Sequence, residues 1–576
     1  MPKKRWTIKN VEDEYSVKSL ADSLNISDIL ASLLVERNVK TFSEAKQFFR
    51  PTLESLHDPF LMDNMEEATT RLIEALTENQ LICIYGDYDV DGTCATAVLY
   101  LFLKELDANV EYYIPKRLEE GYGLSKAAVD QVKQKGTSLL ITVDCGITAI
   151  EETEYANQLG MDVIICDHHQ PKEVLPNALA VLDPLKPNCN YPFKYLSGAG
   201  VAFKLAQGAC ERIGKRDLPL QYIDLVALAG AADIVPLIDE NRVLVAEGLN
   251  MINNNPRPAM VALIEVSHLH PGQLNSGQVV FTLAPRINAV GRLGNAERAV
   301  ELLITDDKSE ALKLARILET ENYERRKIDV DTFDSATELV ENSLDKKNDL
   351  AIVLHYESWH PGVIGIVASR LVEKYYRPTV LLTTIDGVAK GSARSITNFN
   401  IYAALEKCED VLLHFGGHKA AAGVAVEVDK IEEFKEKFNN VVRESVTEDD
   451  LLPEIRIDSK LKFSEITPKF LKVLEQFSPF GPGNLRPVFL SENVQISNIP
   501  RVVGTNHLLL SLKQEGSERI FDCIGFNMGE FYDPIIKNNS KIDVVFTIDK
   551  TIRDRRVFPQ FRLKDIKIEE NIEEIV

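Results

Sequence analysis

Three aspartates stand at alternate positions in one short segment, in a pattern that suits chemistry with divalent cations. Asp87, Asp89 and Asp91 follow an apolar run, and the glycines on either side of them allow the backbone to approach a ligand closely. The alternative is the N-terminus of a helix, where capping and the helix dipole favour carboxylates. A calcium loop is excluded, because Val98 stands where its bidentate glutamate would be.

Further ligand-type side chains stand where other apolar runs end. They are Asp144, Asp167, His168, His169 and Asp233. Each alone has an ordinary explanation, since strands often end in Asp and a His pair is usually hydrogen-bonded within the fold. If the runs are parallel strands, however, their carboxyl ends meet at one edge of a sheet, and these side chains converge there. So much negative charge needs cations, and carboxylates with one or two imidazoles suit Mn²⁺ or Mg²⁺, held as a pair.

Hydrophobic periodicity predicts the elements that position these side chains. Short runs rich in Ile, Val and Leu alternate with amphipathic stretches, which is typical of a parallel sheet covered by helices on both faces. The runs are 81–85, 110–114, 139–143, 163–166 and 180–182. We therefore expect a doubly wound α/β unit.

Other units are expected on either side of this one. A polar stretch without Gly or Pro indicates a long connecting helix or helix pair. After it, the pattern of a strand, a helix and a hairpin at Asp386-Gly387 indicates a second, smaller α/β unit. The short strands that follow indicate a C-terminal β-barrel or sandwich. The expected boundaries are a helical lead-in over 1–50, the first α/β unit over 51–296, connecting helices over 297–348, the second α/β unit over 349–446 and the barrel over 451–576.

Composition excludes several classes of protein. The 576 residues include 65 Lys and Arg against 87 Asp and Glu, so the net charge of −22 argues against a protein that coats nucleic acid through bulk charge. The sequence shows neither a bilayer-spanning apolar run nor a secretory leader, so we expect no membrane. Eight cysteines without a C-x-x-C pair disfavour disulfides and a thiolate zinc site, which indicates a reducing, cytoplasmic location.

The ordered motifs resemble the RecJ family of single-strand-specific 5′-to-3′ DNA exonucleases, within the DHH phosphoesterase superfamily. The resemblance spans about residues 80–420, and its specificity lies in the order of motifs that are weak individually. They are Asp87-Tyr88-Asp89-Val90-Asp91-Gly92, Val143-Asp144-Cys145-Gly146, Asp167-His168-His169, Ala232-Asp233, Asn288-Ala289-Val290-Gly291-Arg292, Trp359-His360-Pro361-Gly362 and Gly416-Gly417-His418. The resemblance implies a DHH domain, a DHHA1 domain after the long helix, and a C-terminal OB-fold.

The resemblance also implies roles in catalysis. Two Mn²⁺ or Mg²⁺ ions are expected on Asp87, Asp89, Asp144, His168 and Asp233, with Asp144 as the bridge. His169 is expected to face the scissile phosphate, in a catalytic group with Asp144 and Asp167. One position departs from the related pyrophosphatases, which carry a metal-binding His where Cys83 stands here, four residues before Asp87. This departure predicts one weaker or open ion site.

Substrate contacts follow from the same resemblance. A 5′-phosphate is expected to be bound by Arg117, Arg292, Ser392 and Arg394, because bidentate arginines and a hydroxyl suit a phosphate. The DNA strand is expected to be contacted by Gly416, Gly417 and His418. Residues 541–567 hold eight basic and four acidic residues with Phe546, Phe558 and Phe561 among them. Such aromatics either stack on unpaired bases or fill a core.

The leading hypothesis is an exonuclease that releases 5′-mononucleotides from the 5′ end of single-stranded DNA in repair and recombination. Single-strand-binding protein and a RecQ-type helicase are its expected partners, and it is expected to be a monomer. The alternatives are a DHH-family oligoribonuclease or cyclic-dinucleotide phosphodiesterase, and an inactive RecJ-like replication scaffold. The length favours the nuclease of long polymers, and the intact Asp and His set argues against the scaffold.

Overall fold

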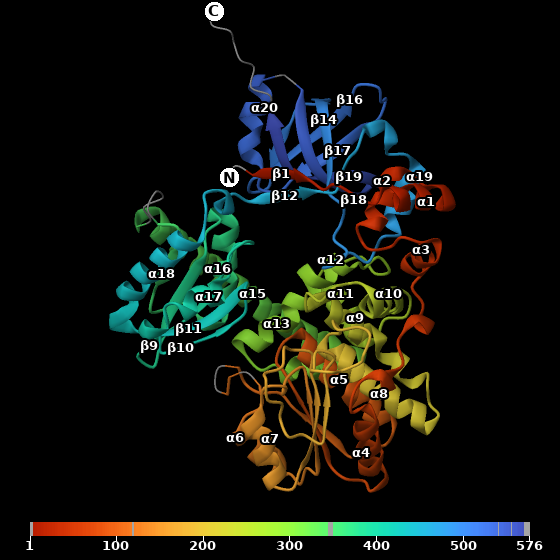
Figure 1. Ribbon diagram of the computed structural model, residues 1–576, viewed down its shortest axis with the longest axis vertical. Coiled ribbons are helices and arrows are strands. Elements are labelled where there is room, and N and C mark those ends of the chain that lie inside the picture. Colours follow the sequence, from red (N-terminus) through yellow and green to blue (C-terminus); the bar gives the residue numbers. More distant parts are fainter. Residues whose placement is uncertain are drawn as a thin grey trace, which may run out of the picture.

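The computed structural model describes residues 4–117, 120–121, 123–343, 349–538, 541–553 and 556–568. In Figure 1 the first α/β unit lies at the bottom, the second at the left and the C-terminal unit at the top. The long helix α15 (Lys308–Ser343) connects the first two units and packs against helices of both. No helix within the described ranges combines the length and hydrophobicity that crossing a bilayer requires.

The first unit is built on a five-stranded sheet in the order β3-β2-β4-β5-β6, in which all neighbours are parallel. Its strands are β2 (Ile82–Gly86), β3 (Val110–Tyr113), β4 (Leu139–Val143), β5 (Asp162–Cys166) and β6 (Ala180–Leu182). Each expected run contains a strand here, because a parallel sheet covered on both faces favours short, mainly apolar segments, although the edge strand β3 also carries Glu111.

Helices cover both faces of this sheet, so the doubly wound prediction is confirmed. Ile82 and Ile84 point into a core shared with α4 (Met65–Thr77), α5 (Val90–Glu105), α8 (Gly198–Ile213) and α9 (Ile223–Ala232). Cys83 and Tyr85 point into the opposite core, with α6 (Lys126–Gln134) and α7 (Ile150–Gln158). The alternation follows from the two-residue period of a strand.

The remaining helices of this unit lead to the connecting helix. They are α10 (Asp239–Asn254), α11 (Pro258–Val266), α12 (Ser276–Gln278), the π-helix η4 (Val279–Leu283), α13 (Ala284–Leu293) and α14 (Glu297–Ile304). Of the two predicted alternatives, the single long helix is correct, because α15 alone spans the stretch without Gly or Pro, and the lack of those residues explains how it reaches 36 residues.

A fully buried ion pair joins α8 to α10. Lys204 and Glu240 both have side chains that are 0% exposed, and Nζ lies 2.6 Å from Oε1. Glu240 also accepts hydrogen bonds from Tyr191 Oη and from the backbone N–H of His57. The pair therefore ties two helices of the first unit to the chain segment that precedes them.

The Glu240→Gln variant should be strongly destabilised, because it leaves the Lys204 ammonium buried without its counter-ion. Breaking a buried pair in this way costs about 3–5 kcal/mol. Urea denaturation measures the effect, with Glu475→Gln as the matched control, since Glu475 pairs with Lys550 at the surface. The control should lose no more than about 1 kcal/mol. Equal losses in the two variants would contradict the assigned importance of the buried pair.

The second unit is smaller and mixed. Its sheet has the order β10-β11-β9-β8-β7, with only β7 and β8 parallel. Helix α16 covers one face, and α17 and α18 cover the other. The elements are β7 (Ile352–His355), α16 (Pro361–Tyr375), β8 (Thr379–Ile385), β9 (Val388–Arg394), α17 (Ile401–Glu406), β10 (His414–Gly417), β11 (Ala421–Glu427) and α18 (Ile431–Ser445). Asp386 and Gly387 turn the predicted hairpin with positive φ values.

The C-terminal unit is a small closed barrel. Strand β14 pairs with both β18 and β16, which closes the ring β14-β18-β19-β17-β16. The elements are β12 (Glu454–Ile457), β13 (Ser459–Lys460), α19 (Pro468–Glu475), β14 (Phe489–Ile496), β15 (Arg501–Val503), β16 (His507–Gln514), β17 (Ile520–Gly525), α20 (Tyr532–Asn538), β18 (Ile542–Arg553) and β19 (Arg556–Ile568). The barrel prediction is confirmed.

The N-terminal segment packs on this barrel. Helices α1 (Glu14–Leu24), α2 (Asp28–Val35) and α3 (Phe42–Phe49) share one hydrophobic core with the barrel strands, and β1 (Arg5–Ile8) pairs in parallel with β12. The helices were expected, but the strand and its partner were not, because no local pattern reveals a pairing between positions some 450 residues apart. In the sequence, both α/β units thus lie between two chain segments that fold together, the N-terminal segment and the C-terminal unit.

Candidate active site

The carboxyl ends of the central strands bring the predicted ligands together. Gly86 of β2, Val143 of β4 and Cys166 of β5 occupy one row of the sheet, and Asp87, Asp144 and Asp167 are the next residues. Asp87, Asp144 and Asp167 are all buried. Asp233 reaches the same edge from the end of α9.

His168 lies at the centre of this cluster. Its Nε2 is 3.1 Å from Asp144 Oδ1, 3.6 Å from Asp233 Oδ2 and 3.7 Å from Asp91 Oδ2. The ligand atoms of Asp87, Asp89 and Asp144 also lie within 4.8 Å of one another. Asp144 joins the two groups, which is the arrangement that a bridging carboxylate requires.

Asp91 belongs to the cluster, although it was not predicted as a ligand. It lies in the first turn of α5, and its carboxylate accepts hydrogen bonds from the backbone N–H groups of Gly198 and Ala199, at 2.6 and 2.8 Å. One of its oxygens lies within 4.8 Å of ligand atoms of His168 and Asp233. The alternating spacing of the three aspartates was the signal for it. Asp89, meanwhile, also caps α5, accepting from Gly92 N–H at 3.1 Å.

The electrostatics of this edge favour a bound cation. Burial and neighbouring carboxylates raise the pKa values of Asp144 and Asp233 well above their ordinary range. Burial and the neighbouring Asp89 raise the pKa of Asp87 to about 8. Asp87 Oδ1 is buried and accepts no hydrogen bond from the described residues. Since hard oxygen ligands with one imidazole suit Mn²⁺ or Mg²⁺, the residues present fit such ions.

Asp167 positions His169 instead of joining the cluster. Its Oδ1 lies 2.7 Å from His169 Nδ1, and its carboxylate also accepts from the backbone N–H groups of Ile147 and His168. Burial lowers the pKa of His169, but the hydrogen bond to Asp167 and the nearby carboxylate charges together outweigh it and raise that pKa to about 9. The imidazole is 41% exposed. It can therefore hold a proton at its outward nitrogen near neutral pH.

Cys83 takes no part in this site. Its side chain is fully buried in the core beneath α6 and α7, near the start of β2, and burial raises the pKa of its thiol. A position at that end of the strand is remote from the carboxyl edge. Cys83 therefore supplies no ligand to the cluster, Asp91 adds a further carboxylate to it, and one weaker or open ion site stays a prediction.

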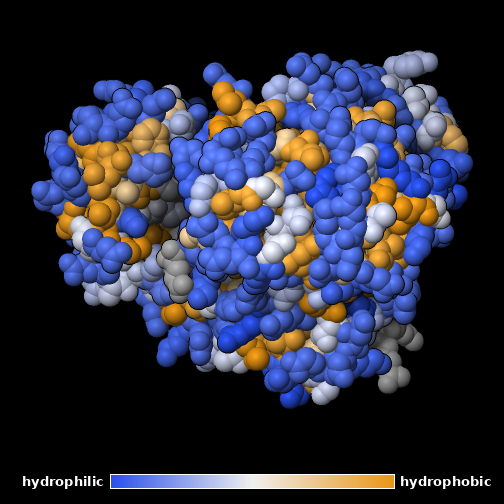
Figure 2. Space-filling model, turned by 90° about the horizontal axis from the view of Figure 1, so that it is seen from below, coloured by the Kyte–Doolittle hydropathy of each residue, from blue (hydrophilic) through white to orange (hydrophobic). Residues whose placement is uncertain are grey.

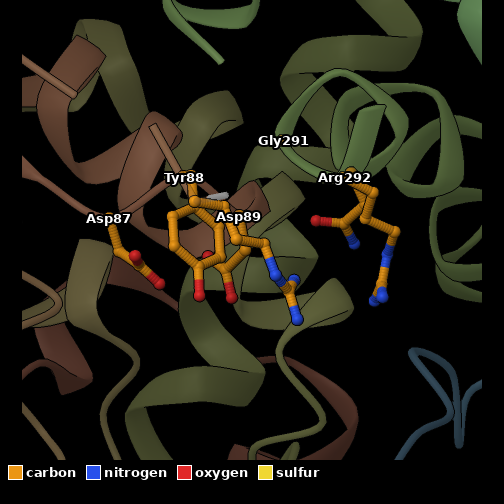
Figure 3. Close-up of a pocket in the computed structure, with 7 residues that line it drawn as sticks. Asp87, Tyr88, Asp89, Gly291 and Arg292 are labelled. Carbon is orange, nitrogen blue, oxygen red and sulfur yellow. The ribbon is translucent and has the colours of Figure 1, made fainter. Parts of the chain in front are cut away.

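A cavity of about 240 Å³ opens beside the carboxylates, lined by Asp87, Tyr88, Asp89, Arg117, Asn288, Gly291 and Arg292. Figure 3 shows Asp87 at the left, Arg292 at the right and Asp89 between them. Arg117 lies over the Tyr88 ring, 5.0 Å from its centroid. A Cβ on Gly291 would lie 2.4 Å from Tyr88 O, so only glycine lets α13 approach this closely.

Arginines from separate elements gather at and beside this cavity. Arg292 at the end of α13 donates to Gly362 O of α16, and Arg394 of β9 donates to Ser392 Oγ at 2.7 Å. Burial and the nearby Arg117, Arg325 and Arg394 lower the pKa of Arg292 to about 10. The structure thus brings together the four predicted pocket residues. Arg325 of α15 was missed, because one basic residue in a polar helix is ordinarily solvated.

The Gly416-Gly417-His418 segment lies on the edge strand of the second sheet. Gly416 pairs with Gly423, which pairs with Ser392, so these residues occupy one row of the sheet. His418 is exposed, and its backbone N–H closes the hairpin on Ala421 O. The segment therefore flanks the arginine pocket at a distance of about two strand spacings, or roughly 10 Å. It is not part of the carboxylate cluster.

The aromatic residues of the barrel divide into two kinds. Phe546 and Phe561 are 0% exposed and stack on each other in the core. Phe558 is 43% exposed, and Phe526, which was not singled out from the sequence, is 45% exposed with Arg562 over its ring. The prediction of a core role is thus correct for Phe546 and Phe561. The exposed rings of Phe558 and Phe526 are the ones that a base could reach.

Comparison with known proteins identifies the family. Three family models match: DHH family, N-terminal domain, over residues 81–230; DHHA1 domain over 348–444; and RecJ OB domain over 457–565. The single-stranded-DNA-specific exonuclease RecJ of Bacillus subtilis is 40% identical over 99% of this chain and 71% of its own length. That of Escherichia coli is 34% identical over 87% of this chain and 89% of its own length. The chain belongs to the RecJ family. The resemblance of the ordered motifs is thereby confirmed.

Solved RecJ structures share the whole architecture. The crystal structure of Thermus thermophilus RecJ in complex with Mn²⁺ has a TM-score of 0.84 and 30% identity, covering 98% of this chain and 80% of that one. The complex with Mg²⁺ has a TM-score of 0.78 and 28% identity, covering 98% and 79%. The two α/β units and the OB-fold barrel predicted from the sequence therefore form the RecJ fold.

Mn²⁺ should stabilise this member of the RecJ family and release protons when it binds. A carboxyl with a raised folded pKa binds more protons in the folded than in the unfolded state, so the metal-free protein loses stability as the pH rises from about 4 towards the Asp87 pKa of about 8. A cation replaces those protons. The Mn²⁺-induced rise in Tm should therefore be larger near pH 8 than near pH 6. Calorimetry in two buffers of different ionisation enthalpy measures the released protons, and equal shifts at both pH values without proton release would contradict the account.

Proposed function

We propose that this protein removes nucleotides one at a time from the 5′ end of single-stranded DNA, with Asp87, Asp89, Asp144, His168 and Asp233 holding two Mn²⁺ or Mg²⁺ ions. The observation that carries the proposal is one cavity that is lined both by the carboxylates of Asp87 and Asp89 and by the guanidinium groups of Arg117 and Arg292. A terminal phosphate among the arginines leaves the next phosphate beside the carboxylates. Because both sets of side chains line one cavity, the arrangement supports release of single nucleotides.

Divalent ions held by these five side chains would supply an activated water as nucleophile and would neutralise charge on phosphate oxygens. The protein's own groups do the rest. Arg117, Arg292, Ser392 and Arg394 hold the 5′-phosphate through charge-assisted hydrogen bonds. His169, held by Asp167, donates a proton to the leaving 3′-oxygen as the bond from phosphorus to that oxygen breaks. The products are a 5′-mononucleotide and a shortened strand with a new 5′-phosphate, which enters the same pocket.

The path of the strand is part of the proposal. Gly416, Gly417 and His418 contact the strand from the second unit, and Phe526 and Phe558 of the barrel stack on its bases. Figure 2 shows a recess between the second unit, at the left, and the rest of the molecule. A path bounded by three units suits one strand and not a duplex.

The other functions fit less well. The match to the RecJ OB domain favours long polymers over cyclic dinucleotides or short RNA, and the complete Asp and His cluster argues against an inactive scaffold. We also propose a cytoplasmic location, because all eight cysteines are free and buried. A monomeric state, and single-strand-binding protein and a RecQ-type helicase as partners, remain proposals from the family resemblance.

One assay tests the function. Purified protein with Mn²⁺ is given labelled single-stranded DNA, duplex DNA, short RNA and cyclic dinucleotides. The expected result is release of 5′-mononucleotides from the 5′ end of single-stranded DNA, with little release from the duplex. Faster hydrolysis of short RNA or cyclic dinucleotides would favour the small-substrate alternative, and binding without hydrolysis would favour the scaffold.

A further inference from the structure

The turn that follows Asp233 has an unusual backbone. Ile234 has a φ of +64°, in the left-handed region that β-branched residues rarely enter, and its side chain is 73% exposed. Burial of its own side chain therefore does not hold Ile234 in this conformation. Such strain persists only where the surrounding structure imposes it. Residues 233–238 are called the Asp233 turn below.

A loop of the C-terminal unit packs against the end of this turn. Residues 478–485, called the docking loop, lie against the Asp233 turn, and Leu237 N–H donates to Pro482 O at 2.7 Å. A Cβ on Gly481 would lie 2.6 Å from Leu237 Cδ1. A Cβ on Gly483, whose φ is +70°, would lie 3.2 Å from both Pro236 and Ile238. The two glycines let the loop and the turn make this close contact.

Arg242 anchors the docking loop from the first unit. It lies in the first turns of α10, just after the Asp233 turn, and is 3% exposed. Its guanidinium donates to five carbonyls, at 2.9 to 3.3 Å: those of Phe48, Gln476, Phe477, Ser478 and Pro479. It also stacks on Phe48 at 3.9 Å. Among the described residues no carboxylate pairs with it, so its charge is satisfied by the two chain segments that fold together.

Two further contacts fix the loop. Ser276 Oγ of α12 donates to Phe480 O at 2.6 Å. Asn484 Nδ2 donates to Phe477 O and Pro479 O, which keeps the loop folded on itself, while its Oδ1 accepts from Arg37 Nε of the N-terminal segment. The loop thus contacts the first unit at the Asp233 turn, at Arg242 and at Ser276, and it contacts the N-terminal segment at Arg37.

We propose that the docking loop and Arg242 are positioning elements of the metal centre: they hold the Asp233 turn so that the Asp233 carboxylate faces His168. The inference rests on the proposed role of Asp233 as a ligand. It makes ion binding depend on a loop of the DNA-binding barrel. By linkage, a bound ion in turn favours the docked barrel.

Gly483→Ala tests the proposal, because a methyl group there pushes on Pro236 and Ile238. The matched control is Gly516→Ala, which puts alanine at a similar positive φ of +80° in the same unit, with nothing within 4 Å of the new Cβ. Loss of an outer contact to a metal ligand costs about 10–100-fold in metal affinity. Mn²⁺ titration by calorimetry should therefore show binding at least tenfold weaker in Gly483→Ala and unchanged in Gly516→Ala.

Kinetics should separate positioning from DNA binding. In Gly483→Ala we expect an unchanged KM for single-stranded DNA and a reduced kcat that high Mn²⁺ restores. Parent-like Mn²⁺ affinity in folded Gly483→Ala would overturn the inference. If that variant does not fold, Arg242→Lys decides the question in the same way, since lysine keeps the charge but supplies fewer donors than the five contacts need.

Asp233→Asn separates the failure of this inference from the failure of the proposed function. If Asp233→Asn weakens Mn²⁺ binding and Gly483→Ala does not, the positioning role is wrong and the ligand assignment stands. If Asp233→Asn binds Mn²⁺ like the parent, the ligand assignment itself is wrong.

Discussion

Asp144→Asn protein is expected to fold and to lose Mn²⁺-dependent hydrolysis of single-stranded DNA. Asp144 is common to two groups of potential ligands, one with His168 and His169 and the other with Asp87 and Asp89. Replacing it removes a ligand from both ion positions. The fall in activity should therefore exceed the roughly 10–100-fold cost of losing an outer contact to a metal ligand. We expect kcat to fall by about a thousandfold or more.

Stability measurements distinguish this loss from unfolding. Because Asn removes a buried carboxyl from a cluster of like charges, the metal-free variant should have a Tm equal to or above that of the parent, and Mn²⁺ should no longer raise it. Asp162→Asn is the matched control, since Asp162 lies at the opposite end of β5 and pairs with Arg71. The control should keep parental activity. Hydrolysis by Asp144→Asn within tenfold of the parent would contradict the assignment.

Arg394→Gln should remove the preference for a 5′-phosphate. Arg394 lies between Ser392 and α16, where a Cβ on Gly365 would be 2.8 Å from its Nη2. A hydrogen bond to a charged group contributes about 1.5–3 kcal/mol, so kcat/KM for 5′-phosphorylated strands should fall about 10–100-fold. The kcat/KM for 5′-hydroxyl strands should change little.

The comparison of the two strand ends makes this test specific. Arg377→Gln is the control, because Arg377 is a half-buried arginine of the same unit whose guanidinium donates to Tyr376 O. It should act on both strands as the parent does. If Arg394→Gln lowers kcat/KM by the same factor for 5′-phosphorylated and 5′-hydroxyl strands, Arg394 supports the fold of the unit and does not bind the phosphate.

The sequence predicted those elements whose signals are local. The strands β2 to β6 were predicted because each is short and apolar, and the placement of Asp87, Asp144 and Asp167 follows directly from the rule that parallel strands share a carboxyl edge. Helix α15 was predicted because no Gly or Pro interrupts it. Both arguments use only a few neighbouring residues.

Features that depend on distant contacts were missed. Strand β1 has no partner until β12 is folded, and Arg325 joins the pocket only because α15 passes beside α13. Arg242 reads as an ordinary surface arginine, yet it is buried among carbonyls from both ends of the chain. Asp91 is intermediate: its spacing was noticed, but its position next to His168 depends on α8, which supplies its backbone donors.

Crystals grown with Mn²⁺ and measured near the manganese absorption edge test the central claim most directly. The account predicts two anomalous peaks at the carboxyl edge of the first sheet, both next to Asp144, with one also near His168 and Asp233 and the other also near Asp87 and Asp89. A protein that cuts single-stranded DNA without a peak there, or with its manganese bound elsewhere, would contradict it.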